Sequence, residues 1–513
     1  MDNANLYARL EAGFPRDRRG IAIETPDLLY TWDDLDQASA CIANLLTSLD
    51  LPEGARVAVQ VEKSPEALIL YLATLRAGLV YLPLNTAYRA AEIEYFLGDA
   101  EPAVVVCASA NLDWMRPLAR KAGTAHVLTL DEDRTGTLLD AAAGQPRTFE
   151  TAPRRADDLA AILYTSGTTG RSKGAMLSHG NLYSNARVLH GYWGWRSTDV
   201  LLHMLPLFHV HGLFVASHGA LLAGAKMIWL PRLDVAQALR YLPRSTVMMG
   251  VPTYYVRLLA DPAFDREACR NMRLFISGSA PLLTETFNEF RRRAGHTILE
   301  RYGMSETVML TSNPCDPAFG ERIGGTVGQA LPGVSVRVVD DGGQPAGPGE
   351  IGHVQVKGPN VFSGYWRMPE KTREEFTADG WFKTGDVGRW GGDSAAGRVP
   401  DNYLSIVGRS KDLIITGGYN VYPKEIESVL DDLPGVDESA VIGVPHPDFG
   451  EAVVAVVVPR AGATLDAAAM LRALKEKIAN FKVPKRIHVA RELPRNAMGK
   501  VQKNVLRDTY RAV

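Results

Sequence analysis

Short apolar runs alternate with amphipathic segments over the first half of the chain, and runs of this length are typical of buried strands. Thr31-x-x-Asp34 matches a capping box at the start of a helix that extends to about Leu49. Ser64-Pro65-Glu66 combines a cap, a proline and an acid, so it predicts a second helix start. The runs that predict strands span residues 56–61, 103–107, 159–163, 246–251 and 274–277. This alternation predicts an α/β fold of helix-covered, mostly parallel sheets.

The pattern changes at about residue 324, where short strands separated by Gly and Pro predict a small β-rich subdomain over 324–408. After residue 408, alternating helical and strand patterns predict a separate α/β unit. We therefore expect an N-terminal domain at 1–408 and a small C-terminal domain at 409–513. The near-apolar segment 212–230 is interrupted by His218 and Lys226, so it predicts a buried helix and a strand rather than a membrane span.

Composition and charge exclude several classes of protein. A chain of 513 residues with 46% apolar and 22% charged residues can form more than one folded core. The net charge of −2 indicates neither a nucleic-acid nor a membrane partner. The four Cys are far apart, without the spacing of a metal site or a disulfide framework, and the first residues lack the apolar core of a signal peptide. We expect a cytoplasmic protein.

The segment 164–174, YTSGTTGRSKG, is rich in Gly, Ser and Thr and contains two cations. Glycines let successive backbone N–H groups point into one concavity, and the hydroxyls and Lys173 add donors and charge. This composition predicts a polyphosphate-binding loop, with an ordinary surface loop as the alternative. The spacing does not match a Walker loop.

Five motifs together carry a family resemblance. In order, they are the 164–174 loop, RYGMSET at 301–307, TGD at 384–386, GRSKD at 408–412 and Pro494-x4-Gly499-Lys500. The set resembles the adenylate-forming enzymes, which include acyl-CoA synthetases, peptide-synthetase adenylation domains and luciferases. Within that superfamily the chain is most similar to the malonate–CoA ligases. The segments that carry this finer likeness are YLPLNTAY at 81–88, SGSAPLL at 277–283, GYWRMPEKT at 364–372, ITGGYNVYPKEIE at 415–427 and NAMGK at 496–500.

The resemblance implies a reaction in two steps, with ATP, Mg²⁺ and CoA. A carboxylate, here malonate, attacks the α-phosphorus of ATP to give an acyl-adenylate and pyrophosphate. The CoA thiolate then displaces AMP to give malonyl-CoA. A C-terminal domain that rotates between the two steps is also implied. The alternatives are methylmalonate or another short-chain acid, a carrier protein as acceptor, luciferase-like chemistry and a nucleotide-binding protein without catalysis.

The resemblance also assigns nucleotide and metal ligands. Glu306 and Thr165 would hold Mg²⁺, a hard cation that prefers carboxylate and phosphate oxygens. Tyr302 would offer an aromatic face to adenine, while Asp386 and Arg409 would bind the ribose. The ATP-binding or AMP-binding positions are Thr165, Ser166, Gly167, Thr168, Thr169, Gly170, Lys173, Ser279, Ala280, Glu300, Arg301, Tyr302, Gly303, Met304, Ser305, Asp386, Arg409 and Lys500.

Lys500, Glu306 and Thr165 would be the catalytic residues. Lys500 would contact the carboxylate and the α-phosphate and stabilise the transition state electrostatically. Composition alone favours a solvated lysine in a basic tail, and only the motif around Lys500 reverses that interpretation. Acetylation by a lysine acetyltransferase would remove its charge, which makes regulation at this residue a hypothesis.

The second step and the acid pocket have their own candidates. Lys411 occupies the implied hinge position. Arg257, on a helix that follows Thr253, is the candidate for a paired cation opposite the second carboxylate, because a desolvated carboxylate needs one. A solvent-facing helix cation is the alternative for Arg257, and a core histidine is the alternative for His209. The remaining candidates are Ser279 and His209 for the acid, and Gly417, Gly418 and Tyr419 for CoA.

One segment departs from the family pattern. Residues 391–400, GGDSAAGRVP, lengthen the connection between the TGD and GRSKD motifs. We expect a surface-loop insertion, because such loops cost little closure entropy.

Overall fold

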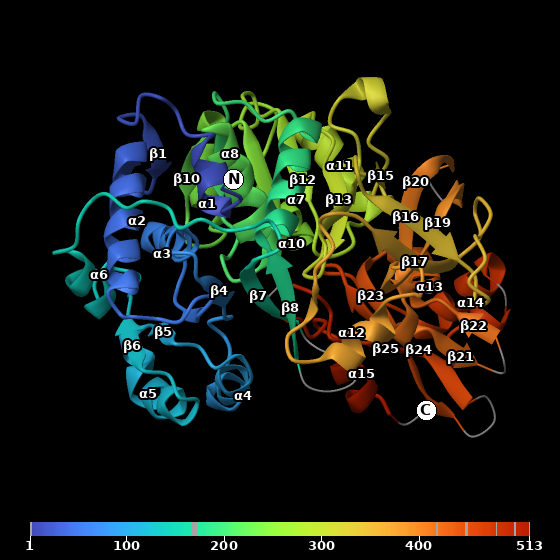
Figure 1. The fold of residues 1–513 in the computed structure, drawn as a ribbon. Helices are drawn as coiled ribbons and strands as arrows, with labels where there is room; N and C mark the ends of the chain where they lie inside the picture. Colours follow the sequence, from blue (N-terminus) through green and yellow to red (C-terminus); the bar gives the residue numbers. More distant parts are fainter. Residues whose placement is uncertain are drawn as a thin grey trace.

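The computed structural model describes residues 3–165, 172–394, 397–416, 419–446, 450–478, 480–496 and 499–511. Within these residues the strands form four sheets, and helices cover the two larger ones (Figure 1). The blue to yellow elements form the largest sheet and most of the second one, while the red elements near the C-terminus lie at the lower right. The expected α/β class is confirmed.

The largest sheet is parallel at its centre and antiparallel at both edges. In spatial order its strands are β15 (Gln329–Ala330), β14 (Val308–Ser312), β13 (Leu299–Met304), β12 (Leu274–Ser277), β11 (Val247–Gly250), β9 (Val200–His203), β10 (Lys226–Trp229), β1 (Ile21–Glu24) and β2 (Leu29–Thr31). The carboxyl ends of β9, β10, β11 and β12 therefore meet at one edge, which is where open α/β sheets bind ligands.

The second sheet contains the expected strands at 56–61, 103–107 and 159–163. In spatial order its strands are β18 (Gly364–Tyr365), β8 (Lys173–Ser178), β7 (Leu159–Thr165), β4 (Val80–Pro83), β3 (Arg56–Gln60), β5 (Val104–Cys107) and β6 (His126–Thr129). β7 and β8 form an antiparallel hairpin, whereas β7, β4, β3, β5 and β6 are parallel. The predicted phosphate-binding loop joins β7 to β8.

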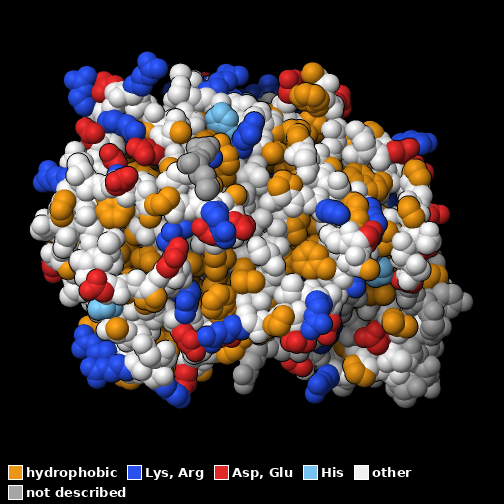
Figure 2. Space-filling model, in the orientation of Figure 1, with side chains coloured by type: hydrophobic (Ala, Val, Ile, Leu, Met, Phe, Trp, Pro, Cys, Tyr) orange, Lys and Arg blue, Asp and Glu red, His pale blue; other side chains and the backbone are white. Residues whose placement is uncertain are grey.

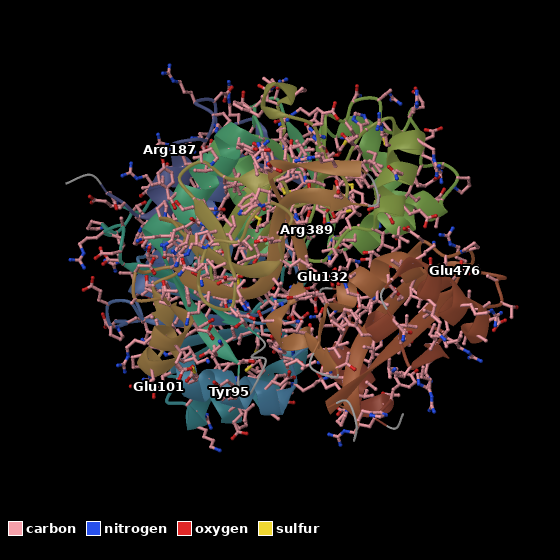
Figure 3. The ribbon with its side chains drawn as sticks, turned by 90° about the vertical axis from the view of Figure 1, so that its right-hand side faces the viewer. Tyr95, Glu101, Glu132, Arg187, Arg389 and Glu476 are labelled. Carbon is pink, nitrogen blue, oxygen red and sulfur yellow. The ribbon has the colours of Figure 1, made fainter. Side chains whose placement is uncertain are left out.

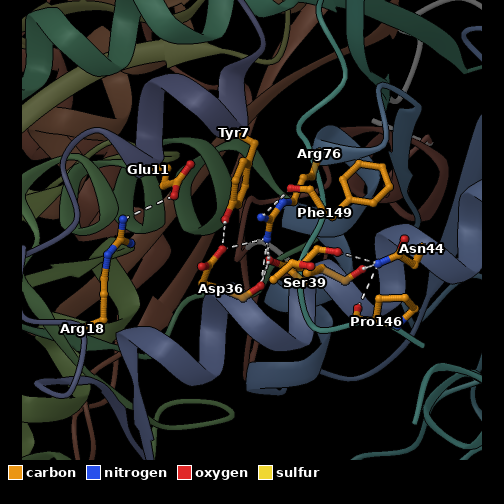
Figure 4. A network of polar contacts seen from close by, with 11 residues as sticks. Tyr7, Glu11, Arg18, Asp36, Ser39, Asn44, Arg76, Pro146 and Phe149 are labelled. Carbon is orange, nitrogen blue, oxygen red and sulfur yellow. Dashed lines mark hydrogen bonds and ion pairs between the residues drawn. The ribbon is translucent and has the colours of Figure 1, made fainter. Parts of the chain in front are cut away.

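Two of the first helices are joined by a network of polar contacts. Every residue of α3 (Pro65–Arg76) is buried, and the Ser64 hydroxyl caps its start by accepting from the Ala67 N–H at 3.1 Å. At the other end, Arg76 donates to the Asp36 carboxylate at 2.8 Å and to the Ser39 hydroxyl at 3.1 Å, both on α2 (Trp32–Thr47) (Figure 4). These hydrogen bonds from a buried cation orient α2 and α3 relative to each other.

Other helices cover the sheets or connect their strands. They are α1 (Leu6–Glu11), α4 (Ala90–Ala100), η1 (Ser109–Asn111), α5 (Leu112–Lys121), α6 (Thr137–Ala142), α7 (His179–Tyr192), α8 (His218–Ala223), α9 (Val235–Tyr241), η3 (Leu242–Arg244), α10 (Pro252–Ala260), α11 (Thr284–Ala294), η4 (Pro317–Phe319) and α12 (Pro369–Glu375). Segment η2 (His211–Ser217) is a π-helix, a conformation common at functional sites. The segment expected to form one buried helix thus divides into η2 and α8. Within the described residues, no helix has the length and apolar character needed to cross a membrane.

The β-rich subdomain is an antiparallel sheet of β16 (Ser335–Val339), β17 (Gly352–Lys357), β19 (Phe382–Ser394) and β20 (Gly397–Arg409). Residues 391–394 and 397–400 continue β19 and β20, with Asp393 paired to Arg398. The expected surface loop is therefore largely an extended β-hairpin. The positive φ of 59° and 90° at Gly391 and Gly392 suits this strand irregularity.

The C-terminal part contains a sheet of its own. Its elements are η5 (Ser410–Asp412), β21 (Ile414–Thr416), β22 (Tyr419–Val421), α13 (Pro423–Asp431), β23 (Val436–His446), β24 (Gly450–Pro459), α14 (Ala467–Lys477), η6 (Asn480–Lys482), β25 (Arg486–Val489) and α15 (Lys503–Thr509). Arg460 contacts Glu285 of α11 at 2.5 Å, which joins the two parts of the molecule. In the side view of Figure 3, Glu476 marks the C-terminal part, opposite Tyr95 and Glu101. The domain boundary at 408/409 stays a prediction.

Candidate active site

The β7–β8 hairpin places the candidate metal and phosphate residues next to β18. Thr165 pairs with Lys173 across the hairpin. The Lys173 ammonium lies 3.2 Å from the Glu375 carboxylate and 4.1 Å from the centre of the Tyr365 ring. The loop candidates that lie outside the described residues are Ser166, Gly167, Thr168, Thr169 and Gly170.

Glu306 is a buried carboxylate beside this group, and it accepts a hydrogen bond from the Tyr365 hydroxyl at 3.0 Å. Burial raises the pKa of Glu306, whereas its hydrogen bonds and the nearby Lys173 charge act in the opposite direction. A buried carboxylate of this kind favours a cation. Together with phosphate oxygens, Glu306 and Thr165 therefore fit the needs of Mg²⁺.

The TGD motif forms the candidate ribose site. Asp386 is buried and lies 3.1 Å from the guanidinium of Arg409. The Tyr302 hydroxyl donates to its other carboxylate oxygen. Burial, and then the negative charge of Asp386, raise the pKa of Tyr302 well above its usual value, so Tyr302 stays a neutral donor. The structure thus brings three predicted nucleotide residues from three elements into contact.

Lys500 lies close to this group although it belongs to the C-terminal part. The neighbouring Gly499 packs on α10, since a Cβ built there would lie 3.6 Å from the Thr253 hydroxyl. The Lys500 side chain is exposed to solvent, yet the surrounding protein is dense enough to lower its pKa to about 8. The dense surroundings disfavour the charged form and are the main cause, the Arg409 charge adds to this effect, and Asp386 and Glu306 oppose it.

The low pKa of Lys500 predicts a pH limit on activity. The protonated ammonium is the form that stabilises negative charge, so activity should fall as the pH rises through about 8. We expect kcat/KM for ATP to decline above that pH, because this parameter reports the free enzyme. The Lys500→Arg variant should be slower but lose the decline, since a guanidinium stays charged. A wild-type profile that is flat to about pH 9.5 would contradict this role.

Arg301 is buried, with 3% of its surface exposed, on β13. Among the described residues, its Nε and Nη2 atoms have no hydrogen-bond partner. The guanidinium lies against Gly278, where an added Cβ would come within 2.4 Å of Cζ. Burial lowers the pKa of Arg301, but a guanidinium remains protonated at neutral pH. A buried cation with unpaired N–H groups is built to bind an anion.

Two histidines and a serine adjoin Arg301. Burial lowers the pKa of His209 to about 3, and the charges of Lys500 and Arg301 lower it further. Nδ1 of His211 lies 3.3 Å from the Ser279 hydroxyl. Ser279 has a φ of 72°, a conformation that non-glycine residues adopt rarely and most often at functional sites. The predicted acid-binding residues Ser279 and His209 are thus brought together, with His211 and Arg301 added.

Glu300, the neighbour of Arg301 on β13, is a second buried charge in this region. It accepts from the Leu282 N–H at 3.2 Å, and its other carboxylate oxygen has no partner among the described residues. Burial raises the pKa of Glu300 to about 8, although the Lys424 charge in the C-terminal part opposes this. Its pairing with Ser277 at the end of β12 is compatible with the predicted nucleotide role. Other predicted positions in this strand and turn are Gly303, Met304 and Ser305.

Several candidates differ from expectation or lie elsewhere. Arg257 is on α10 as predicted, but it is exposed, whereas a desolvated partner for a carboxylate was expected. Exposure follows from helix geometry, because Tyr255 and Leu258 form the buried face. Lys411 is exposed in η5. The CoA candidates Gly417 and Gly418 lie outside the described residues, and Tyr419 is described only as part of β22.

The sequence interpretation missed Glu375, Tyr365 and His211 as parts of the site. Tyr365 lies within the GYWRMPEKT segment, and His211 lies two residues after the candidate His209, so the sequence had marked both regions. Glu375 has no such signal, because its contact with Lys173 spans 202 positions of the chain.

A family model described as AMP-binding enzyme matches residues 13–366, and one described as AMP-binding enzyme C-terminal domain matches residues 425–500. The chain belongs to the AMP-binding enzyme family. The expected membership of the adenylate-forming enzymes is thereby confirmed.

Relatives of this AMP-binding enzyme include malonate–CoA ligases. The chain is 37% identical over 488 residues to the malonate–CoA ligase of Arabidopsis thaliana, an alignment that covers 89% of this chain and 78% of that protein. It is 36% identical over 472 residues to the mitochondrial malonate–CoA ligase ACSF3 of Homo sapiens, covering 85% and 79%.

A solved structure resembles this AMP-binding enzyme along nearly its whole length. ATP-bound MatB from Rhodopseudomonas palustris is 55% identical, covers 99% of both chains and gives a TM-score of 0.95. Apo MatB, with the same identity and coverage, gives a TM-score of 0.84. The arrangement described above is thus more similar to the ATP-bound form.

Proposed function

We propose that this AMP-binding enzyme is an ATP-dependent malonate–CoA ligase that acts through a malonyl-adenylate. The observation that carries the proposal is the buried guanidinium of Arg301, of which Nε and Nη2 have no partner among the described residues, near His209 and within electrostatic range of Lys500. A dicarboxylate brings two negative charges, and this site offers two separate cations. The malonate–CoA ligase relatives and the ATP-bound MatB structure support the same substrates.

In the first step, one malonate carboxylate oxygen attacks the α-phosphorus of ATP. The bond from that phosphorus to the bridging oxygen breaks, and pyrophosphate leaves. We assign Lys500 to stabilise the charge that moves between carboxylate and phosphate, and Asp386 and Arg409 to hold the ribose. Glu306 and Thr165 would hold Mg²⁺, which neutralises phosphate charge when bound.

We propose the second carboxylate for Arg301, which the resemblance placed among the nucleotide-binding positions, with Ser279 and His209 as neighbouring groups. A guanidinium can bind a carboxylate through two parallel hydrogen bonds, and two nitrogens of Arg301 have no partner within the described ranges. Arg257 stays a second candidate because it lies on the adjoining α10. Its exposure makes it the weaker one, since solvent screens an exposed pair.

In the second step, the CoA thiolate attacks the acyl carbon and AMP leaves with the electron pair. Lys500 approaches the candidate nucleotide site from the C-terminal part, so the structure is compatible with the adenylation step. We propose that this part rotates about Lys411 for thiolation and brings Gly417, Gly418 and Tyr419 to CoA.

An ATP-dependent and CoA-dependent thioester assay with malonate, methylmalonate, succinate, acetate and octanoate tests the proposal. We expect malonate to be used best, and acetate to be poorer by at least about 10²-fold, because the buried cation would be left unpaired. A preference for methylmalonate would favour that alternative. A preference for acetate or octanoate would overturn the dicarboxylate site, and no pyrophosphate release with any acid would overturn the enzyme assignment.

Two finer proposals concern the cell. A cytoplasmic location is supported by the free, widely spaced cysteines, although the human relative is described as mitochondrial. Charges of both signs are mixed on the face in Figure 2, without a large basic patch there for nucleic acid or membrane.

We also propose that a lysine acetyltransferase can silence the enzyme at Lys500, whose side chain is exposed.

A further inference from the structure

Lys63 is a buried cation outside the site described so far. It follows β3 in the second sheet, has 7% of its surface exposed and reaches into the largest sheet. Its Nζ lies 2.9 Å from Nδ1 of His203, 2.8 Å from the His203 carbonyl oxygen and 2.7 Å from the Leu230 carbonyl oxygen. The three donors of an ammonium thus face three acceptors. Nζ also lies 4.4 Å from the centre of the Trp229 ring.

The contacts of Lys63 differ from those of an ordinary ion pair. Its partners are an imidazole, two carbonyls at the ends of β9 and β10, and an aromatic face. Because these partners are neutral, the charge of Lys63 does not neutralise a buried carboxylate. Lys63 fixes the orientation of each group that it contacts, because losing one contact leaves a buried polar group unpaired.

His203 passes this constraint to the π-helix η2. With Nδ1 accepting from Lys63, Nε2 carries the proton and donates toward the Gly212 carbonyl and the Ser217 hydroxyl, each 3.1 Å away. The Ser217 hydroxyl also donates to the Gly212 carbonyl, at 2.9 Å. Gly212 itself cannot carry a side chain, because a Cβ there would lie 2.0 Å from the Pro206 carbonyl oxygen. The start of η2 is therefore held from two sides.

The same start of η2 bears on the proposed acid pocket. His211, its first residue, faces the Ser279 hydroxyl at 3.3 Å, and the His211 N–H lies 3.3 Å from Nδ1 of His209. The Arg301 charge contributes to the low pKa of both histidines. An unbroken series of contacts thus runs from Lys63 through His203 and Gly212 to the residues assigned to the acid.

We propose that Lys63 and His203 are positioning residues for the acid pocket, and that they fix η2 so that His209 and His211 are placed for the second carboxylate. This inference rests on the proposed function. Among the described residues, Asp386 bonds to Arg409 and Tyr302, and Glu306 accepts from Tyr365, so the hydrogen bonds of these nucleotide residues go to groups outside this series. The positioning role therefore affects KM for the acid and leaves KM for ATP unchanged.

Matched variants of His203 test the inference. His203→Gln keeps an acceptor toward Lys63 and a donor toward η2, whereas His203→Phe keeps a ring against Trp229, now 4.5 Å away, and loses both hydrogen bonds. Lys63→Met removes the ammonium, and Ser217→Ala removes one hydroxyl with little risk to folding. We expect KM for malonate to rise about 10-fold or more in His203→Phe and Lys63→Met, and about 3-fold or less in His203→Gln and Ser217→Ala, with KM for ATP within about 2-fold throughout.

Each variant is first checked by thermal unfolding, and active sites are titrated with ATP and malonate. An unchanged KM for malonate in folded Lys63→Met and His203→Phe would overturn the inference. So would equal rises in the KM for malonate and for ATP, which indicate a general structural role. If Lys63→Met does not fold, the inference is tested by comparing KM for malonate between His203→Gln and His203→Phe. Wild-type enzyme that prefers another acid would refute the proposed function instead, and the same variants are then measured with that acid.

Discussion

The Lys500→Ala variant should lose adenylate formation by at least about 10²–10³-fold, as expected for the loss of one preorganised group that stabilises transition-state charge. The physical reason is its position: Lys500, in the C-terminal part, lies within electrostatic range of Arg409, Asp386 and Arg301. Pyrophosphate release with malonate and ATP measures this step. Thioester formation from supplied malonyl-adenylate and CoA should largely survive, because the C-terminal part is proposed to have rotated away by then.

Lys475→Ala is the matched control, since Lys475 is an exposed lysine of α14 in the same part of the chain. Both half-reactions should stay within about 2-fold of the wild type, as for most surface substitutions. Equal loss of both half-reactions in Lys500→Ala would contradict the assignment of Lys500 to the first step alone.

Arg301→Met should remove the preference for a dicarboxylate. Losing a buried, charge-assisted pair costs about 2–5 kcal/mol, or roughly 30-fold to several thousand-fold in kcat/KM for malonate. Activity with acetate should fall much less, because acetate has no second carboxylate to bind. The ratio of kcat/KM between malonate and acetate is the quantity to measure.

The stability of Arg301→Met separates function from folding. Arg301 is buried, and two of its nitrogens have no partner in the part of the chain that the structure describes, so replacing it by an apolar side chain of similar length should leave the melting temperature unchanged or raise it. Arg257→Met is the control at the exposed candidate and should change kcat/KM for malonate by less than about 5-fold. A larger loss at Arg257 than at Arg301 would transfer the carboxylate-binding role to Arg257.

Local signals predicted much of the fold. The cap at Ser64 and the capping box at Thr31 depend only on neighbouring residues, and both helices begin there. The strand at 274–277 is reproduced residue for residue, because a short apolar run between polar segments has few alternatives. The extended hairpin at 391–400 was expected as a loop, since a Gly-rich and Ser-rich composition favours turns and does not reveal pairing with a partner strand.

The candidate site was predictable where motifs carry it and unpredictable where burial decides it. The contact of Asp386 with Tyr302 and Arg409 follows from three motifs. The choice between Arg257 and Arg301 does not, because helix rotation and the packing against Gly278 arise only in the tertiary structure. The role of Lys63 was not predicted for the same reason, because two of its acceptors belong to His203, which is 140 positions away in the sequence.

The bare backbone at Gly278 has a consequence for redesigning acid selectivity. Because the guanidinium of Arg301 occupies the space where a side chain at 278 would stand, these two positions form a single steric unit. A library that varies position 278 alone would mostly displace the cation rather than reshape the cavity. A larger residue at 278 combined with a shorter, uncharged residue at 301 would remove the buried positive charge and change the shape of the cavity. These two substitutions together offer a route toward branched monocarboxylic acids.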